Sequence, residues 1–118
     1  MTVREFYAAV GGDGEKTIHR FDGEERVRKY LAFMLNDPTF SELSAAFAAA
    51  DYERAFPAVH TLKGVAANLG LLPLQRSCGV LTEELRGGSP DSERAEKLFR
   101  RVESDYFEVI FQVPLVLG

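Results

Sequence analysis

The sequence predicts an all-α fold: an antiparallel four-helix bundle with short helical elements at its N-terminus. Apolar residues recur at spacings of three and four along much of the chain, which is the helical period. Alternating β-branched stretches, the usual mark of strands, are missing. The chain has 118 residues, of which 46% are hydrophobic and 27% charged. We therefore expect a single globular domain over residues 1–118.

The N-terminal elements are short because glycines interrupt them. Residues 2–10 favour a helix that ends at the glycines between positions 11 and 14, and residues 15–21 favour one or two further turns. Asp22-Gly23 separates these turns from a clearer helix over residues 24–35. The apolar residues of that helix fall near one face: Val27, Leu31, Met34 and Leu35.

Two of the longer helices are predicted over residues 38–50 and 51–69. Asp37 followed by Pro38 is typical of an N-cap and a first helical position, and Asp51 is a second N-cap. Gly70 is a plausible C-terminal cap. The first apolar stripe is Phe40, Leu43, Phe47 and Ala50, and the second is Ala55, Val59, Leu62, Ala66 and Leu69.

The last two helices are predicted over residues 73–86 and 90–112. Gly87-Gly88 ends the first of them, and Ser89-Pro90 repeats the pattern of a cap followed by proline. Their stripes are Leu74, Cys78, Leu81 and Leu85, then Leu98, Val102, Tyr106, Val109 and Val113. We expect the apolar stretch from Phe107 to Leu117 to pack on the bundle rather than to anchor the chain in a membrane.

Composition excludes several classes of protein. Lys plus Arg number 14 against 18 Asp plus Glu, so the net charge of −4 disfavours binding to a nucleic-acid backbone. The single cysteine, Cys78, excludes an internal disulfide and lies on an apolar stripe, which favours a buried thiol. The N-terminus lacks a signal-peptide pattern, and no apolar run is long enough to span a bilayer. We expect a cytoplasmic monomer without membrane, metal or cofactor.

One helical face departs from the apolar pattern. His60, Lys63, Gly64 and Ala67 recur at i, i+3, i+4 and i+7, so they share a face beside the core stripe. An imidazole is a nucleophile at neutral pH, and the lysine can offset the charge of a phosphoryl group bound to it. Gly64 costs roughly 1 kcal/mol against alanine inside a helix, and its bare surface gives a partner close access. A surface or core histidine and a glycine at a helix–helix contact are the structural alternatives.

These residues resemble a known motif. The segment His60-Thr61-Leu62-Lys63-Gly64, followed by small residues up to Gly70, resembles the signature of histidine-containing phosphotransfer (HPt) domains. The segment 20–23, Arg-Phe-Asp-Gly, is similar to the N-terminal part of such domains. The likeness extends over nearly the whole chain, with the specific motifs between residues 56 and 86.

The resemblance implies a function. His60 would be the phosphoacceptor of a helical bundle without kinase activity, which relays a phosphoryl group in two-component signalling. Its partners would be receiver domains, whose aspartates exchange the phosphoryl group, and hybrid histidine kinases. Catalysis and Mg²⁺ would reside in the receiver. The alternatives are a scaffold that binds receivers or kinases without being phosphorylated, and, less well supported, an enzyme that uses His60 as a general base.

The next helix can be placed opposite His60 by register. If the turn centres near Leu71-Leu72, the residue facing His60 lies near position 82. Thr82 is then expected to hydrogen-bond the imidazole or a phosphoryl oxygen, and Arg86 to add positive charge to the docking surface. Glu83-Glu84 reads as a solvated pair, because adjacent helical positions point about 100° apart.

Overall fold

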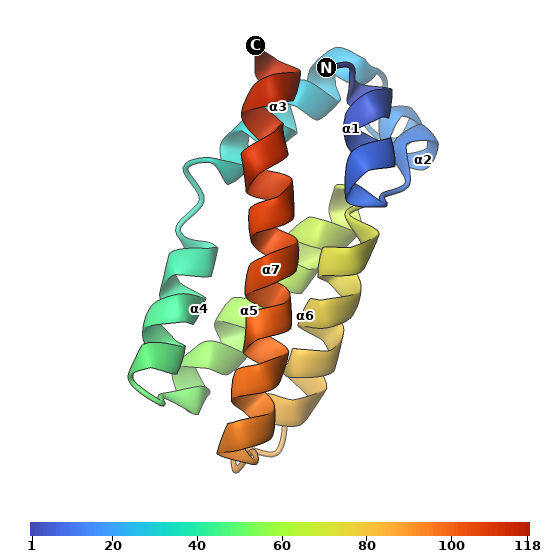
Figure 1. The fold of residues 1–118 in the computed structure, drawn as a ribbon. Coiled ribbons are helices and arrows are strands. Elements are labelled where there is room, and N and C mark those ends of the chain that lie inside the picture. Colours follow the sequence, from blue (N-terminus) through green and yellow to red (C-terminus); the bar gives the residue numbers. More distant parts are fainter.

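The computed structural model describes all 118 residues and contains seven α-helices. Three helices form the N-terminal part: α1 (Val3–Val10), α2 (Gly14–Arg20) and α3 (Glu24–Met34). Four more form the antiparallel bundle: α4 (Thr39–Ala48), α5 (Tyr52–Asn68), α6 (Leu72–Leu85) and α7 (Ser92–Leu117). In Figure 1, α7 runs the whole length of the molecule, and α1–α3 lie around its C-terminal half. The predicted all-α bundle with N-terminal helical elements is therefore confirmed.

Aromatic stacking closes the bundle between α4 and α7. The Phe40 ring lies nearly parallel to that of Tyr106, with centroids 4.2 Å apart, and Phe47 stacks on Phe99 at 4.5 Å. Each parallel pair stabilises the fold by about 0.5–1.5 kcal/mol beyond the contribution of the apolar area that it buries. The stripes predicted for α5 and α6 are buried at every position. The core is thus continuous from α4 through α5 and α6 to α7.

The N-terminal helices cap the C-terminal end of α5. The last carbonyls of a helix have no partner within it. Tyr7 donates its hydroxyl to the carbonyl of Leu69 at 2.6 Å, and the Thr17 hydroxyl lies 3.3 Å from the same oxygen. The backbone N–H of Asp13 donates to the carbonyl of Gly70 at 2.9 Å. Segments more than fifty residues apart in sequence therefore hold the α5–α6 turn.

Two predicted helix starts are wrong by one or two residues. α4 begins at Thr39, and the Asp37 carboxylate accepts the Thr39 backbone N–H at 2.8 Å from just outside the helix. α7 begins at Ser92 rather than at Pro90. Its N-cap is Asp91, whose carboxylate accepts the N–H groups of Glu93 and Arg94. A carboxylate that bonds two free N–H groups outweighs the cap-and-proline pattern of Ser89-Pro90.

Two other helix ends also differ from expectation. Ala50 is exposed and has φ +51°, so it ends α4 instead of extending its stripe. The N–H of Asp51 then bonds the carbonyl of Ala46 at 2.8 Å, which is the Schellman arrangement. α7 continues past the expected end near residue 112, through Pro114 to Leu117. Burial of Val113 and Val116 keeps one side of this last turn on the bundle, as predicted, whereas Phe111 and Leu115 of the same stretch are exposed.

Candidate functional site

α5 is the platform of the candidate site. Asp51 caps its start by accepting the Arg54 N–H at 3.2 Å, as the sequence predicts. α5 packs against α4 and α6, and burial of its apolar stripe fixes the rotation of the helix about its axis. His60 follows the buried Val59, about 100° further round the helix, and its side chain is exposed. The imidazole is therefore presented to solvent by a helix that the core holds in place.

Gly64 leaves the surface beside His60 bare. A Cβ built at Gly64 would have no atom within 4 Å, so no contact inside the chain requires a glycine there. Side chains on a helix lean toward its N-terminus, so a larger residue at position 64 would lean over His60. The helix–helix contact considered for Gly64 is thus wrong. The bare surface provides access to the imidazole from outside the molecule.

Lys63 leans toward α6. Its Cε lies 3.7 Å from the position that a Cβ on Gly79 would occupy, so its methylene chain crosses this glycine. The pKa of the exposed Glu83 carboxyl is lowered chiefly by its hydrogen bond and ion pair with Arg86, and further by the Lys63 charge. The Lys63 side chain therefore lines the surface between α5 and α6, together with Gly79 and Glu83.

The C-terminal end of the site face is tied to α2. Ala67 is half-buried, and its carbonyl accepts a hydrogen bond from the Arg20 guanidinium at 3.1 Å. The same guanidinium nitrogen donates to the carbonyl of Asn68 at 2.7 Å. A cation at a helix C-terminus also interacts favourably with the helix dipole. The small-residue surface at Ala67 is therefore held in place by the N-terminal part of the chain.

The register predicted for α6 agrees with the observed contacts, but one residue predicted from it does not face the site. The contacts between Phe56 and Arg86 and between Lys63 and Gly79 are symmetric about Leu71, which places Thr82 level with His60. Thr82 is nevertheless 0% exposed. Its hydroxyl donates to the carbonyl of Cys78, one turn earlier, at 2.7 Å. The expectation that Thr82 reaches a phosphoryl group is wrong, because this side chain belongs to the core.

Arg86 follows the last residue of α6 and is exposed. It lies beside Phe56, which is one turn before His60 on α5. Its guanidinium donates hydrogen bonds to Glu83 from Nε and Nη2 and lies 5.6 Å from the centroid of the Phe56 ring. The Phe56 ring in turn lies nearly parallel to the His60 imidazole, with centroids 6.3 Å apart and 13° between the planes. Sequence reasoning missed Phe56. Its position four residues before His60 was the signal, since i and i+4 side chains are neighbours on a helix.

Two other candidate groups lie outside this face. Cys78 is buried, and desolvation raises the pKa of its thiol to about 12, in agreement with the predicted core thiol. His19 is exposed on α2.

No group of three or more His, Cys, Asp or Glu side chains is placed to hold a metal ion. None of the helices is both long and apolar enough to span a bilayer.

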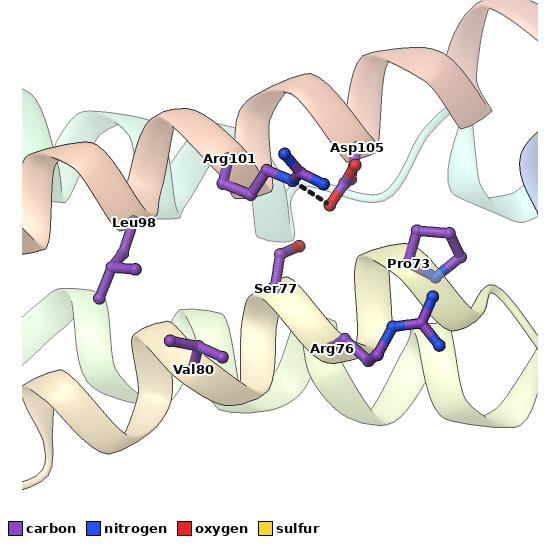
Figure 2. Close-up of a pocket in the computed structure, with 7 residues that line it drawn as sticks. All are labelled: Pro73, Arg76, Ser77, Val80, Leu98, Arg101 and Asp105. Atoms are coloured by element: carbon purple, nitrogen blue, oxygen red, sulfur yellow. Dashed lines mark ion pairs between the residues drawn. The ribbon is translucent and has the colours of Figure 1, made fainter.

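A groove between α6 and α7 contains none of the predicted site residues. It has a volume of about 240 Å³ and is shown in Figure 2. Arg101 and Asp105 form an ion pair at 3.6 Å on its α7 side, and Ser77 lies on its α6 side. The groove is therefore separate from the candidate site, whose nucleophile is the exposed imidazole of His60 on α5.

Comparison with protein families identifies the class of this chain. The family model of the Hpt domain matches residues 33–106, which is more than half of the sequence. The match includes α4, α5 and α6 completely, with the end of α3 and the first half of α7; the segment 20–23 lies outside it. No curated protein and no solved structure matched the chain. The chain belongs to the Hpt domain family.

Membership defines the general role. Hpt domains carry phosphoryl groups in two-component signalling, and they are phosphocarriers rather than kinases. Their partners are the receiver and kinase proteins of these systems. The matched region contains the whole of α5 and therefore the exposed histidine.

Proposed function

We propose that His60 accepts a phosphoryl group from the aspartyl phosphate of a receiver domain and returns it by the reverse reaction. The observation that carries this proposal is the exposed imidazole beside Gly64, where a side chain would meet no neighbouring atom. A glycine in a helix interior lowers stability by roughly 1 kcal/mol relative to alanine. Since no internal packing requires Gly64, access for a partner explains it.

The transfer needs only a nucleophile and a well-placed partner. The unprotonated ring nitrogen of His60 attacks phosphorus, with Nε2 as the outer nitrogen of the imidazole. The P–N bond forms while the P–O bond to the receiver aspartate breaks, and its electron pair leaves with the carboxylate. No proton has to leave the attacking nitrogen. Phosphoryl transfer is catalysed mainly by positioning and electrostatic stabilisation, which the receiver and its Mg²⁺ would supply.

Lys63, Gly64, Ala67 and Arg86 would form the surface around the acceptor. The Lys63 ammonium would offset the added negative charge, since a phosphoryl group carries between one and two charges. Gly64 and Ala67 would let the receiver approach the helix backbone closely. Arg86 would add a cation at the α6 side of the docking surface, one turn from the imidazole.

The direct test uses receiver domains that have been phosphorylated with acetyl phosphate and Mg²⁺. The wild-type protein, His60→Gln and the matched control His19→Gln are each mixed with them, and intact mass is measured. We expect an increase of about 80 Da, one HPO₃ group, in wild type and His19→Gln but not in His60→Gln. The adduct should be labile in acid and stable in base. Label on His60→Gln would refute the assignment, and binding without any adduct would favour the scaffold alternative.

A second variant separates access from stability. Gly64→Ala should raise the free energy of unfolding by about 0.5–1 kcal/mol, because alanine favours the helix and its Cβ meets no neighbour. The same change should slow phosphoryl transfer by adding a methyl group that leans toward His60. Urea unfolding and transfer kinetics measure the two effects. An unchanged transfer rate in a stabilised variant would contradict the access role of Gly64.

A further inference from the structure

A chain of side-chain contacts leads from α6 to the candidate phosphoacceptor. The Glu83 carboxylate accepts hydrogen bonds from Arg86 Nη2 at 2.9 Å and from Arg86 Nε, which is shared between both oxygens, at 3.2 and 3.3 Å. The Arg86 guanidinium lies 5.6 Å from the centroid of the Phe56 ring. The His60 imidazole is a second neighbour of that ring and lies nearly parallel to it, with the two centroids 6.3 Å apart. Three successive contacts thus connect Glu83 on α6 to the proposed nucleophile, His60, on α5.

Phe56 is a rigid member of this chain. Its side chain is half-buried and packs against the core, whereas His60 and Arg86 are both exposed. A guanidinium over an aromatic face is attracted by the ring quadrupole. The two-point contact with Glu83 sets the orientation of the guanidinium plane. The phenyl ring is therefore fixed from the core side by packing and from the α6 side by Arg86.

The imidazole of His60 lies against this fixed ring. A helical side chain leans toward the N-terminus of its helix, which takes His60 toward Phe56 and away from Gly64. An exposed histidine without such a neighbour would populate several χ1 wells, and its χ2 rotation would be broad. Near-parallel stacking selects one ring plane among these conformers.

We propose that Phe56, held by Arg86, is a positioning residue that keeps the His60 imidazole in one orientation for phosphoryl transfer. The inference rests on the proposed role of His60 and extends it to two residues outside the sequence motif, Phe56 and Arg86. The rate of phosphoryl transfer depends on the population of the His60 conformer whose ring nitrogen is aligned for attack on phosphorus. Without the phenyl ring, the spread over the two χ1 wells that a helical residue occupies should lower that population about twofold.

The experiment compares four variants of the full chain. Phe56→Leu removes the ring but keeps an apolar side chain, Phe56→Tyr keeps the ring, and Arg86→Gln removes the cation. Phe111→Leu is the matched control, because this phenylalanine is exposed on α7 and lies outside the site. Two quantities are measured: the three-bond Hα–Hβ couplings of His60 by NMR, and the rate of transfer from a phosphorylated receiver as a function of receiver concentration.

In Phe56→Leu we expect averaged His60 couplings and a saturating transfer rate reduced about twofold, with KM unchanged. Phe56→Tyr should give the wild-type couplings and rate, and Phe111→Leu should match wild type. Arg86→Gln should give couplings and a rate between those of wild type and Phe56→Leu. The proposal is overturned if Phe56→Leu leaves the couplings and the saturating rate unchanged. It is also overturned if only KM rises, since Phe56 would then be a docking contact.

The two readouts separate this inference from the proposed function. The couplings report the orientation of His60 in the unphosphorylated protein and need no transfer reaction. If wild type accepts no phosphoryl group, the proposed function fails and the positioning role fails with it, even where the couplings show an ordered ring. If wild type is phosphorylated and Phe56→Leu behaves like wild type, only the positioning role fails.

Discussion

Substitution of Gly70 by alanine should strongly destabilise the protein. Gly70 has φ +66°, in the left-handed region that residues with a Cβ rarely adopt. A Cβ at this position would lie 2.1 Å from the Thr17 hydroxyl oxygen and 2.9 Å from the carbonyl oxygen of Asp13. The Thr17 side chain would have to turn away. It would then lose its hydrogen bonds to the carbonyls of Asp13 and Leu69.

The magnitude follows from two contributions. The left-handed backbone costs an alanine about 1 kcal/mol, and each of the two lost hydrogen bonds costs about 1 kcal/mol, for a total of about 3 kcal/mol. Gly88 provides the matched control, because its φ is +78° and a Cβ there would meet no atom within 4 Å. Gly88→Ala should therefore cost only the backbone contribution of about 1 kcal/mol.

Equilibrium unfolding in urea of wild type, Gly70→Ala and Gly88→Ala measures the difference directly. Equal destabilisation of the two variants would refute the account, because it would show that the contact between the α5–α6 turn and Thr17 contributes nothing. The double variant Thr17→Ala with Gly70→Ala gives a second check. Removing the hydroxyl relieves the closest overlap, so the two changes together should cost less than the sum of the single ones.

Two further predictions concern pH and helix ends. Burial raises the pKa of the Tyr7 hydroxyl to about 12 from 10.0 and that of the Cys78 thiol to about 12 from 9.0. The unfolded chain therefore loses these protons first, so the contribution of these two groups to the free energy of unfolding should be constant at neutral pH and fall as the pH rises from about 9 toward 12. Urea unfolding at several alkaline pH values should show this fall, and Tyr7→Phe should reduce it. Ala50→Gly should raise stability by about 1 kcal/mol, because Ala50 has φ +51° at the end of α4. A urea midpoint that fails to rise would contradict this reasoning.

Local sequence signals predicted the helices well where periodicity and capping agreed. The α5 stripe is buried throughout, Asp51 caps its start, and Gly70 adopts the positive φ of a C-terminal cap. Where a signal was only a dipeptide, the prediction was less accurate. Ser89-Pro90 was displaced by Asp91, whose carboxylate bonds two N–H groups. Proline position alone cannot decide between neighbouring caps, because hydrogen-bond geometry determines which residue accepts.

In the candidate site, too, some features followed from local sequence signals and others did not. Helical spacing alone placed His60, Lys63, Gly64 and Ala67 together, since residues three, four and seven apart share a face in any helix. The register of α6 also followed from the position of the turn. The burial of Thr82 was overlooked, although Thr82 lies four residues after Cys78 and three before Leu85 and so shares the face of their apolar stripe.

The sequence by itself thus determined the class of fold, the order of the helices and the face that presents His60, because helical periodicity is a local property of the chain. Only the tertiary structure decided which distant groups complete that face. It placed Arg20 on the carbonyls that end α5 and Arg86 over the ring of Phe56. It also left the surface at Gly64 without a neighbour. Such contacts depend on how helices pack around a shared core, and no spacing within one helix encodes that packing.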